Sequence, residues 1–516
     1  MKRIIPIAAA VLSGVLLFLS FPPFEIEFLG WVALIPLILA CAGAAPRRAA
    51  GLGWLAGAIF FLGTLFWLRH VTWFGFVALA FYCALYMIPF ATFISLRSCG
   101  WRSMARVKNL AWIIGAAAVW TASEYVRATF ITGFPWNPLG VSQYAQGTLI
   151  QIAEWGGVYF LSALMVFVNV ASAVTLLQYI SGLRSSGYRL HVELMSALFL
   201  LALASSFGLR VLLAEEASSE PVRAALIQPN VPEVGNWDVP DPELIYERLE
   251  ELTDIAGHML DLDLIIWPET ALPDCVRYSA RSAGLVEQTT RITGVPLLAG
   301  SMDYIWRPSG TPDFYNGSML FNTRGELLSS YYKQHLVLFG EYIPFDGQIP
   351  FVNALTPIGS SFTPGHQTTL FKLPGDPRGF SVLICFEDTL PYLARRAAQR
   401  GATWLVNQTN DSWFDPDCGS KQHLANAVFR CIETRLPMVR CTNTGITCLI
   451  DKKGRITQTI APRVEGVQAV EVTPADPARA PTIHTRFGDW FAQACLLGSV
   501  ALFIVALIKR RKTTHA

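Results

Sequence analysis

The stretch that decides the fold of the polar part of this chain is 381-SVLICFEDTLP-391. Residues 381–384, three of them apolar, suit a buried strand and lead directly into a thiol, Cys385, an aromatic residue and two carboxylates. Continuous apolar runs of this length predict strands of a sheet that is covered on both faces. A thiol inside such a strand is usually inert core, whereas a thiol at the end of a strand is where a nucleophile would be displayed. Both interpretations are open at this point.

The region around this stretch, residues 221–480, alternates strand-like and helix-like segments and predicts an α/β domain of about 260 residues. The expected strands are 223–230, 262–269, 296–300, 315–322, 381–385, 403–409 and 439–451. The expected helices are 241–260, 390–400 and 420–435. The segment 343–365 is rich in Pro, Gly and aromatic residues and is long for a structureless connection, which is typical of lids and binding loops.

The composition predicts that the rest of the chain lies largely in a lipid bilayer. Of the 516 residues, 52% are hydrophobic and only 15% are charged, whereas about 25% of a soluble protein is charged. The mean hydropathy is +0.39. A membrane span needs roughly 20 mostly apolar residues. Eight spans are predicted, at about 4–21, 27–44, 51–68, 71–96, 109–128, 155–180, 191–214 and 488–508, the last followed by a basic tail, 509–516.

Lys and Arg gather at alternate ends of these spans, and this bias predicts the orientation of the chain. The basic ends carry Lys2 and Arg3, then Arg47 and Arg48, then four cations within 97–108, then Arg184 and Arg189, then the tail at 509–512. We therefore expect both termini in the cytoplasm and the 221–480 domain on the outer side. The net charge of +2 gives no indication of a nucleic-acid partner.

The ten cysteines do not form a recognisable framework or metal site. The sequence has no CxxC and no His–Cys spacing typical of zinc ligands, so no metal and no other cofactor is predicted. Six of the cysteines lie in the 221–480 domain, and the sequence leaves their pairing open.

Three segments of the predicted domain each carry one reactive side chain. Glu269 ends 264-LIIWPET-270, Lys333 lies in 331-YYKQHLVLFGEYIPF-345, and Cys385 ends its strand. A carboxylate can take the proton of a thiol, and a fixed ammonium can stabilise both a thiolate and the oxyanion of a tetrahedral intermediate. Taken singly, Glu269 could cap a turn, Lys333 could be a solvated surface lysine and Cys385 could be core.

The strings WPET, YYKQHLVLFGEYIPF and ICFED, in this order, resemble the carbon–nitrogen hydrolase (nitrilase) superfamily. The resemblance covers about residues 221–475, and 404-WLVNQTNDSWF-414 is similar to the superfamily's following strand. It implies an αββα sandwich with a catalytic Glu, Lys and Cys, here Glu269, Lys333 and Cys385. Together with eight spans, the segments 133-GFPWNPLG-140, 227-IQPNVP-232 and 483-IHTRFGDWF-491 resemble a membrane-embedded acyltransferase family within this superfamily.

That resemblance implies a function in the cytoplasmic (inner) membrane of a bacterium, with the catalytic domain on the periplasmic side. The expected reaction moves an acyl chain from a phospholipid, through a thioester on Cys385, to the N-terminal amine of a diacylglyceryl-cysteine in an apolipoprotein. Glu269 is the expected base, and Lys333 with the backbone N–H of Phe386 the expected oxyanion donor. Further expected residues are Glu341 and Glu387 in support of the site, and Trp237 and Trp136 at the substrate. The family often has Tyr at the position of Phe386, so a role of that side chain is in doubt.

Three other functions share some of these features. A membrane-tethered amidase or nitrilase acting on a small amide or nitrile would use the same three side chains, but a tether needs one helix rather than eight. A transporter or channel would be expected to carry ionisable residues within its spans. The predicted spans hold few charges, and Glu124 and Glu154 are the main acids in or beside them, so this function is disfavoured. A catalytically inactive lipoprotein-binding scaffold is disfavoured by the intact Glu269, Lys333 and Cys385.

Overall fold

The computed structural model describes residues 4–96, 106–180, 191–215, 219–231, 241–259, 261–343, 361–414 and 418–514. The chain divides into two compact units. Unit 1 consists of Met1–Ala214, Asp417–Phe429 and Arg486–Ala516, and unit 2 of Glu215–Pro416 and Arg430–Thr485. Residues 417–429, which fall inside the predicted polar domain, therefore group with the apolar helices.

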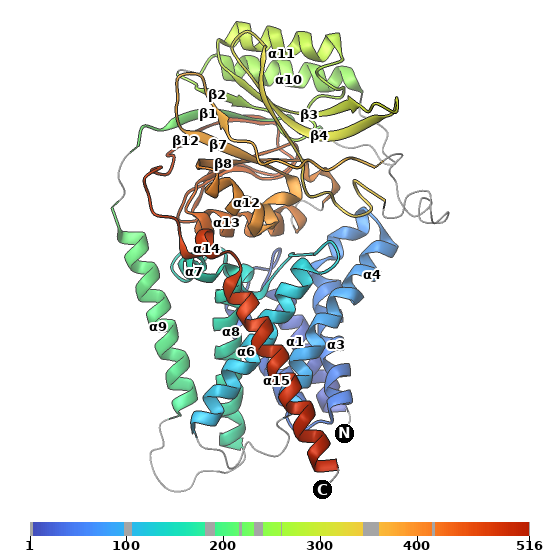
Figure 1. Ribbon diagram of the computed structural model, residues 1–516, viewed down its shortest axis with the longest axis vertical. Coiled ribbons are helices and arrows are strands. Elements are labelled where there is room, and N and C mark those ends of the chain that lie inside the picture. The colour runs from blue at the N-terminus through green and yellow to red at the C-terminus, as the bar shows by residue number, and fades with distance from the viewer. Residues whose placement is uncertain are drawn as a thin grey trace. The chain divides into compact units, whose positions relative to one another are not determined.

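Unit 1 is helical (Figure 1). Its helices are α1 (Ile4–Leu19), α2 (Ile35–Cys41), α3 (Pro46–Thr64), α4 (Trp73–Ala84), α5 (Ile88–Ser95), α6 (Arg106–Thr129), α7 (Ala153–Gly156), α8 (Val158–Ile180), α9 (Val192–Leu213) and α15 (Trp490–Thr514). Short 3-10 turns join several of them, namely η1 (Glu27–Trp31), η2 (Phe66–His70), η3 (Leu85–Met87), η4 (Leu139–Gln143) and η5 (Leu149–Ile152).

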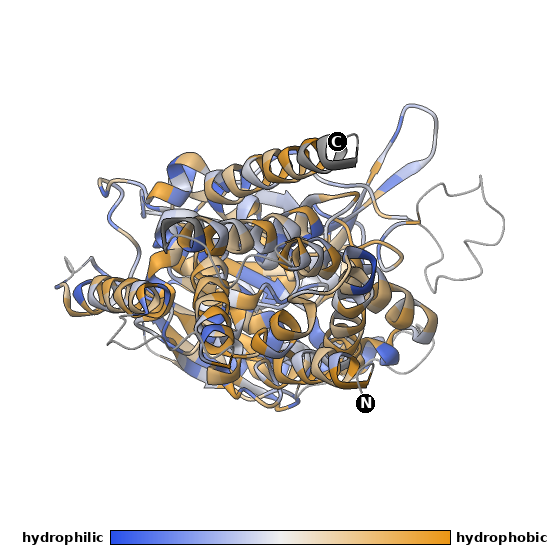
Figure 2. Ribbon diagram, turned by 90° about the horizontal axis from the view of Figure 1, so that it is seen from below, coloured by the Kyte–Doolittle hydropathy of each residue, from blue (hydrophilic) through white to orange (hydrophobic). Residues whose placement is uncertain are grey.

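Four helical segments among the described residues are long and apolar enough to cross a membrane: Trp73–Ser95, Val158–Ile180, Val192–Leu213 and Trp490–Ile508. Ile4–Leu19 and Glu27–Cys41 are apolar but shorter, and Pro36 lies at the start of the short helix α2. Apolar side chains on α9 and α15 are exposed, including Phe199 (63%) and Leu497 (73%). Hydrophobic colour runs along the helices in Figure 2. Exposed apolar helix faces of this kind are expected where lipid is the solvent.

Unit 2 contains two six-stranded sheets. The first has the order β12-β1-β2-β3-β4-β5, formed by β1 (Val222–Gln228), β2 (Leu264–Ile266), β3 (Leu297–Trp306), β4 (Pro312–Phe321), β5 (Leu327–Tyr332) and β12 (Gly466–Val472). The second has the order β11-β10-β9-β8-β7-β6, formed by β6 (Phe371–Lys372), β7 (Gly379–Ile384), β8 (Ala402–Thr409), β9 (Met438–Thr442), β10 (Thr447–Ile450) and β11 (Ile456–Ile460).

The two sheets pack face to face and helices cover their outer faces, which is the predicted αββα sandwich. Apolar side chains of both sheets, such as Leu226 and Val406, share one buried cluster between them. A second cluster joins the first sheet to α10 (Pro242–Gly257) and α11 (Ala280–Thr293), which lie side by side over it in Figure 1. Helix α12 (Pro391–Gln399) packs against β7 and β8 on the other side, and α13 (Gly419–Thr434) contributes residues to both units.

The middle of each sheet is parallel, with β1, β2 and β3 in one and β7, β8 and β9 in the other. Because side chains that follow parallel strands emerge at the same edge of a sheet, residues after β2 lie at one edge of the first sheet and residues after β7 at one edge of the second.

The predicted single strand 439–451 is wrong, because the segment is a hairpin in which β9 and β10 pair antiparallel. Gly445 lies in its turn, and a Cβ there would stand 2.2 Å from a carboxylate oxygen of Asp411. The turn can therefore close only with glycine at this position. None of the nine cysteines that the structure describes is in a disulfide.

Candidate active site

The three predicted reactive residues each follow a strand of unit 2 directly or within a short turn. Glu269 lies three residues beyond the end of β2, Lys333 one residue beyond β5, and Cys385 one residue beyond β7. Glu269 and Lys333 are buried, with exposed fractions of 7% and 2%. Buried ionised groups are stable only when they are paired and hydrogen-bonded, so the contacts of these two residues decide what they do.

Lys333 lies between two carboxylates. Its Nζ is 2.8 Å from Oε1 of Glu341 and 3.4 Å from Oε1 of Glu269. The other oxygen of Glu341 accepts the backbone N–H of Val337 at 2.8 Å. The structure thus brings Glu269, Lys333 and Glu341 together, and Glu341 holds the ammonium in place from the loop that follows Lys333.

Asn316, on β4, belongs to this cluster and was not predicted. Its Nδ2 donates to Oε1 of Glu269 at 2.8 Å and lies 3.2 Å from Oε1 of Glu341, and its backbone oxygen accepts the N–H of Lys333 at 2.9 Å. The second oxygen of Glu269 accepts the backbone N–H of Asn410 at 2.8 Å. The carboxylate of Glu269 is therefore fixed in orientation by Asn316 on β4, by Lys333 just after β5 and by the loop after β8.

The electrostatics of the cluster fit a base that acts beside a permanent cation. Burial raises the pKa of Glu269, with the Lys333 ammonium and the Asn316 hydrogen bond acting in the opposite direction. Burial alone would lower the pKa of Lys333, but the carboxylates of Glu341 and Glu269 raise it above its usual value. Lys333 thus stays charged, while Glu269 holds a proton more readily than a solvated glutamate.

Cys385 begins the short 3-10 turn η7 (Cys385–Thr389) with a φ of 50°, in the left-handed region. Non-glycine residues in sparsely populated backbone regions cost about 1–3 kcal/mol and are concentrated at functional sites. The backbone oxygen of Cys385 accepts a hydrogen bond from Asn407 at 3.1 Å, which helps to hold this conformation. Burial and the nearby Glu269 carboxylate raise the pKa of the thiol well above its usual range, and Lys333 opposes this. The thiol is therefore protonated at rest, and it would need a base to act as a nucleophile.

Glu387 is fully buried and joins the turn after Cys385 to the segment after Lys333. One of its oxygens accepts the N–H groups of Gln334 (2.7 Å) and His335 (3.0 Å). The other accepts Tyr331 Oη (2.8 Å) and the N–H of Ile384 (2.8 Å). Burial raises the pKa of Glu387 to about 7 despite these donors. Glu387 thus holds together the turn that follows Cys385 and the segment that follows Lys333.

Phe386 presents its ring to His335, whose ring stacks on it at 5.8 Å between centroids. Burial, together with the Lys333 charge, lowers the pKa of His335 to about 4, so this imidazole is neutral near pH 7. The side chains of Phe386 and His335 therefore form an uncharged pair of rings next to Cys385 in the chain.

Of the two predicted substrate tryptophans, the structure describes one. Trp136 is in unit 1 with an exposed fraction of 1%; its Nε1 donates to Gln422 at 2.7 Å, and its ring stacks on Phe134. Trp237 lies outside the described residues, as do residues 344–360 of the predicted lid. A role of any of these in substrate binding stays a prediction.

The domain has two six-stranded sheets between helices, with Glu, Lys and Cys at or near the ends of strands. This arrangement is that of a hydrolase-type domain, and residues 223–481 match the family described as "Carbon-nitrogen hydrolase". Two solved structures are similar to about half of the chain. Nit3 of Saccharomyces cerevisiae, a member of branch 10 of the nitrilase superfamily, is 20% identical with a TM-score of 0.39, covering 51% of this chain and 93% of that protein. An amidase from Nesterenkonia sp. is 20% identical with a TM-score of 0.36, covering 51% and 94%.

The apolar part has a more specific match, since residues 13–171 match the family described as "Apolipoprotein N-acyltransferase N-terminal domain". Over nearly the full length the chain is similar to proteins named apolipoprotein N-acyltransferase. That of Geobacter metallireducens is 35% identical, covering 98% of this chain and 96% of the relative, and that of Brucella melitensis is 30% identical, covering 91% and 90%. The chain therefore belongs to the apolipoprotein N-acyltransferase family. It is an acyltransferase and a bacterial membrane protein.

Proposed function

We propose that this chain transfers an acyl chain from a phospholipid to the N-terminal amino group of a diacylglyceryl-cysteine in apolipoproteins, in two half-reactions joined by a thioester on Cys385. The observation that carries the proposal is the buried ammonium of Lys333 between Glu269 and Glu341, at 3.4 and 2.8 Å, within electrostatic reach of the thiol. A base, a fixed cation and a protonated thiol are the groups that acyl transfer through a cysteine needs.

In the first half-reaction the thiol proton of Cys385 passes to Glu269 as the sulfur attacks the ester carbonyl of the phospholipid. Lys333 and the backbone N–H of Phe386 stabilise the negative charge that develops on the carbonyl oxygen. The C–O bond of the ester then breaks, and Glu269 returns its proton to the departing alkoxide. The products are the thioester and a lysophospholipid.

In the second half-reaction the uncharged α-amine of the lipoprotein attacks the thioester carbonyl. Glu269 takes a proton from the attacking nitrogen, the C–S bond breaks, and the proton returns to the sulfur of Cys385. The raised pKa of Glu269 suits both transfers, because a carboxyl group serves as base and then as acid best when its pKa lies near the working pH. Formation of the amide consumes the thioester and returns Cys385 to its free thiol form.

Both proposed substrates are anchored in a membrane, and this supports the proposal that the chain crosses the membrane several times. We propose seven spans within 1–214, a catalytic domain over 221–480, an eighth span at 488–508 and a basic cytoplasmic tail at 509–516. The bias of Lys and Arg toward alternate span ends supports cytoplasmic termini and a catalytic domain on the periplasmic side. Cysteine-accessibility labelling of single-cysteine variants in intact cells tests this orientation.

The thioester is tested with purified full-length protein and a phospholipid that carries a labelled acyl chain, without acceptor. Label should attach covalently to the protein, be released by neutral hydroxylamine and be lost in Cys385→Ala. The matched control is Cys275→Ala, because Cys275 is another free, partly exposed thiol of the same unit. Label that persists in Cys385→Ala would exclude Cys385 as the nucleophile.

The transfer step is tested by adding a diacylglyceryl-cysteinyl peptide to the labelled acyl-enzyme. The label should move to the N-terminal amine of the peptide as a hydroxylamine-resistant amide. A protein that releases only free fatty acid under these conditions would be a phospholipase, and the assignment of the acceptor would fail.

A further inference from the structure

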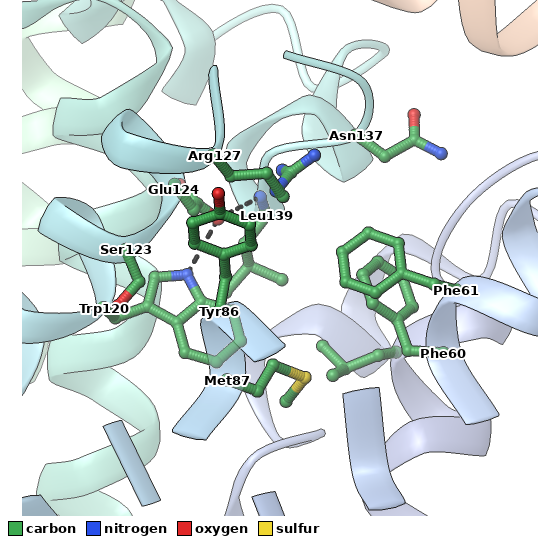
Figure 3. Close-up of a pocket in the computed structure, with 11 residues that line it drawn as sticks. Phe60, Phe61, Tyr86, Met87, Trp120, Ser123, Glu124, Arg127, Asn137 and Leu139 are labelled. Atoms are coloured by element: carbon green, nitrogen blue, oxygen red, sulfur yellow. Dashed lines mark hydrogen bonds between the residues drawn. The ribbon is translucent and has the colours of Figure 1, made fainter. Parts of the chain in front are cut away.

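Buried charged side chains occur in both units, and one set of them lies beside the candidate active site. In unit 1, Glu124 accepts the Nε1–H of Trp120 at 2.8 Å and the N–H of Leu139 at 2.7 Å, next to a small pocket (Figure 3). This pocket has a volume of about 20 Å³, which is room for about one water molecule. A buried ion network of unit 2 lies instead between the turn that carries the proposed nucleophile and the loop that holds the proposed base.

Arg440, on β9, is the centre of this network. Its side chain is fully buried, as are those of Asp388 and Asp411. The Nη1 of Arg440 forms an ion pair with Oδ2 of Asp388, and its Nη2 lies 3.6 Å from Oδ2 of Asp411. Burial alone would lower the pKa of Arg440, but these two carboxylates raise it above its usual value. A planar guanidinium presents its N–H donors in a fixed fork, so this one side chain holds two carboxylates from different segments.

The first carboxylate belongs to the turn that displays the thiol. Asp388 lies in η7, which begins at Cys385, and Cys385 has a left-handed backbone with a φ of 50°. The side chain of Asn407 donates to the backbone oxygen of Cys385 at 3.1 Å, and Asn407 is the residue that pairs with Arg440 across β8 and β9. Arg440 therefore lies behind the nucleophile turn and is tied to it through Asp388.

The second carboxylate belongs to the loop that orients the base. Asp411 directly follows Asn410, whose backbone N–H donates to Oε2 of Glu269 at 2.8 Å. The other oxygen of Asp411 accepts the hydroxyl of Thr409 at 3.2 Å, and this hydroxyl is among the groups that lower the pKa of the thiol of Cys385. A shift of Asp411 would therefore be passed on to the carboxylate of Glu269.

We propose that Arg440 is a positioning residue that fixes the separation between the sulfur of Cys385 and the carboxylate of Glu269, because it holds Asp388 and Asp411 at the same time. The inference rests on the proposed function, in which the thiol proton passes directly to Glu269. Replacing a buried ion pair by apolar residues is often neutral or stabilising, so stability alone does not account for three buried charges here. A misplacement of about 1 Å between reacting groups can slow a reaction about 100-fold.

Charged or titratable groups surround Cys385 on the segments packed around it. They are Glu269 after β2, Lys333 and His335 after β5, Glu387 and Asp388 within η7, Asp411 after β8 and Arg440 on β9. Burial and the carboxylates of Glu269 and Asp411 raise the pKa of the thiol, and Lys333 lowers it. Arg440→Lys keeps every charge in this set, so this variant changes the geometry and leaves the balance of charge in place.

The test therefore uses full-length Arg440→Lys, whose ammonium is a single point charge and cannot reproduce the fork. Two rates are measured per folded protein below the unfolding transition: alkylation of Cys385 by iodoacetamide, located by mass mapping, and single-turnover acylation by labelled phospholipid. At pH 7 alkylation should be about tenfold slower and acylation about 100-fold slower than in the parent, with half-saturation by phospholipid within about twofold. Alkylation should approach the parent's rate as the pH rises, because the thiol then loses its proton to solvent.

The matched control is Arg430→Lys. Arg430 is also buried (2%), forms an ion pair with Glu433 at 2.8 Å and donates to the backbone oxygen of Thr389, at the end of the same turn, at 2.8 Å. This variant should change both rates by less than about threefold. Equal slowing by Arg430→Lys and Arg440→Lys at equal loss of stability, or unchanged rates in Arg440→Lys, would overturn the proposal.

A second series cuts the network without removing the arginine, and it decides the question even if Arg440→Lys does not fold. Asp388→Asn releases the nucleophile turn and Asp411→Asn releases the loop of the base. Each should slow alkylation at pH 7, and the double variant should be no slower than the slower single variant, because either change uncouples the two segments. Effects that multiply would overturn the proposal. Absence of phospholipid labelling in the parent would defeat the proposed function instead, and the alkylation rates would still decide the role of Arg440.

Discussion

Asn316 donates a hydrogen bond to Glu269 at 2.8 Å, and this contact favours the carboxylate form of the proposed base. The same amide nitrogen lies 3.2 Å from Glu341, so one neutral side chain lies between the two acids that flank Lys333. Without this donor, the two carboxylates and the ammonium would be held in place by fewer partners. Asn316 is thus expected to set both the orientation and the proton affinity of Glu269.

Replacing this residue by Asn316→Leu should make Glu269 harder to deprotonate. Loss of a hydrogen bond to a charged group costs about 1.5 kcal/mol or more, which corresponds to about one pKa unit. The base acts only when it is deprotonated, so the acid limb of the acylation rate should move up by about one pH unit, with recovery at higher pH. Single-turnover labelling by phospholipid across the pH range measures this shift.

Asn410→Ala is the matched control for that profile, because Asn410 contacts Glu269 through its backbone N–H, which the variant keeps. The acid limb of its acylation rate should lie at the same pH as that of the parent protein. If Asn316→Leu instead lowers the rate by the same factor at every pH, then Asn316 shapes the site without acting on the proton affinity of Glu269.

Glu387 should be required for stability as well as for rate, because it accepts four hydrogen bonds from both reactive segments. In Glu387→Gln an amide N–H would face donors, so at least one buried donor would lose its acceptor at a cost of about 1–3 kcal/mol. We expect a lower midpoint of thermal unfolding and slower labelling of Cys385. Glu326→Gln, at an exposed turn of the same unit, should change neither. A Glu387→Gln protein with unchanged unfolding and tenfold slower labelling would indicate a direct part in the chemistry.

His335 should make the folded state sensitive to mild acid. Its pKa is lowered from 6.5 to about 4, so between these pH values the unfolded chain binds a proton that the folded chain does not. Stability is then lost as the pH falls through this window, by up to about 3 kcal/mol for one residue. His335→Gln removes this proton linkage. The difference in unfolding free energy between parent and variant should therefore change steadily between pH 6.5 and 4.

The comparison for His335 is Gln334→Asn, which changes the neighbouring side chain and leaves the imidazole in place. Because this variant adds and removes no titratable group, its difference from the parent should be flat over the same pH range. A flat difference for His335→Gln as well would mean that the imidazole becomes protonated in the folded state without penalty.

The sequence patterns were sufficient to predict an α/β domain, and the resemblance of its motifs to the nitrilase superfamily supplied the αββα sandwich and the three side chains Glu269, Lys333 and Cys385. Glu269 and Cys385 each follow an apolar run inside a distinctive string, whereas Lys333 was located by its string alone, because the strand before it, LLSSYY, is partly polar and was not predicted. Asn316 was missed because an asparagine inside a strand carries no signal of its own. Its meaning comes from the pairing of β4 with β5, which places it beside Lys333.

Other differences between the sequence-based predictions and the structure also have physical causes. The hairpin β9–β10 was read as one strand because its turn is short and flanked by apolar residues, and only the approach of Asp411 shows why Gly445 is there. Helix α11 was missed because its sequence, ARSAGLVEQTTRIT, carries few apolar residues. The surroundings of Trp136 depend on Gln422, which is 286 residues away in the chain and is therefore not accessible to any local pattern.

Gln422 leads to the last prediction, which concerns the expected substrate role of Trp136. The fully buried Oε1 of Gln422 accepts from Trp136 (2.7 Å), Asn137 (3.0 Å) and Trp67 (3.2 Å), while its Nε2 donates to the backbone oxygens of Pro22 (2.9 Å) and Thr64 (3.0 Å). Gln422→Leu would leave several buried polar groups without partners. Each such group costs about 1–3 kcal/mol, so the variant should unfold at a clearly lower temperature.

Trp136→Phe removes only one donor from this network and should lower stability less than Gln422→Leu. Because Trp136 is 1% exposed, we expect the KM for phospholipid, measured per folded protein below the unfolding transition, to stay within about twofold of the parent, a difference of less than 0.5 kcal/mol. Trp112→Phe serves as the control, since Trp112 is another indole of unit 1, stacked on Phe93 and outside the Gln422 network. A tenfold rise in KM for Trp136→Phe without a change in unfolding would instead establish Trp136 as a substrate contact.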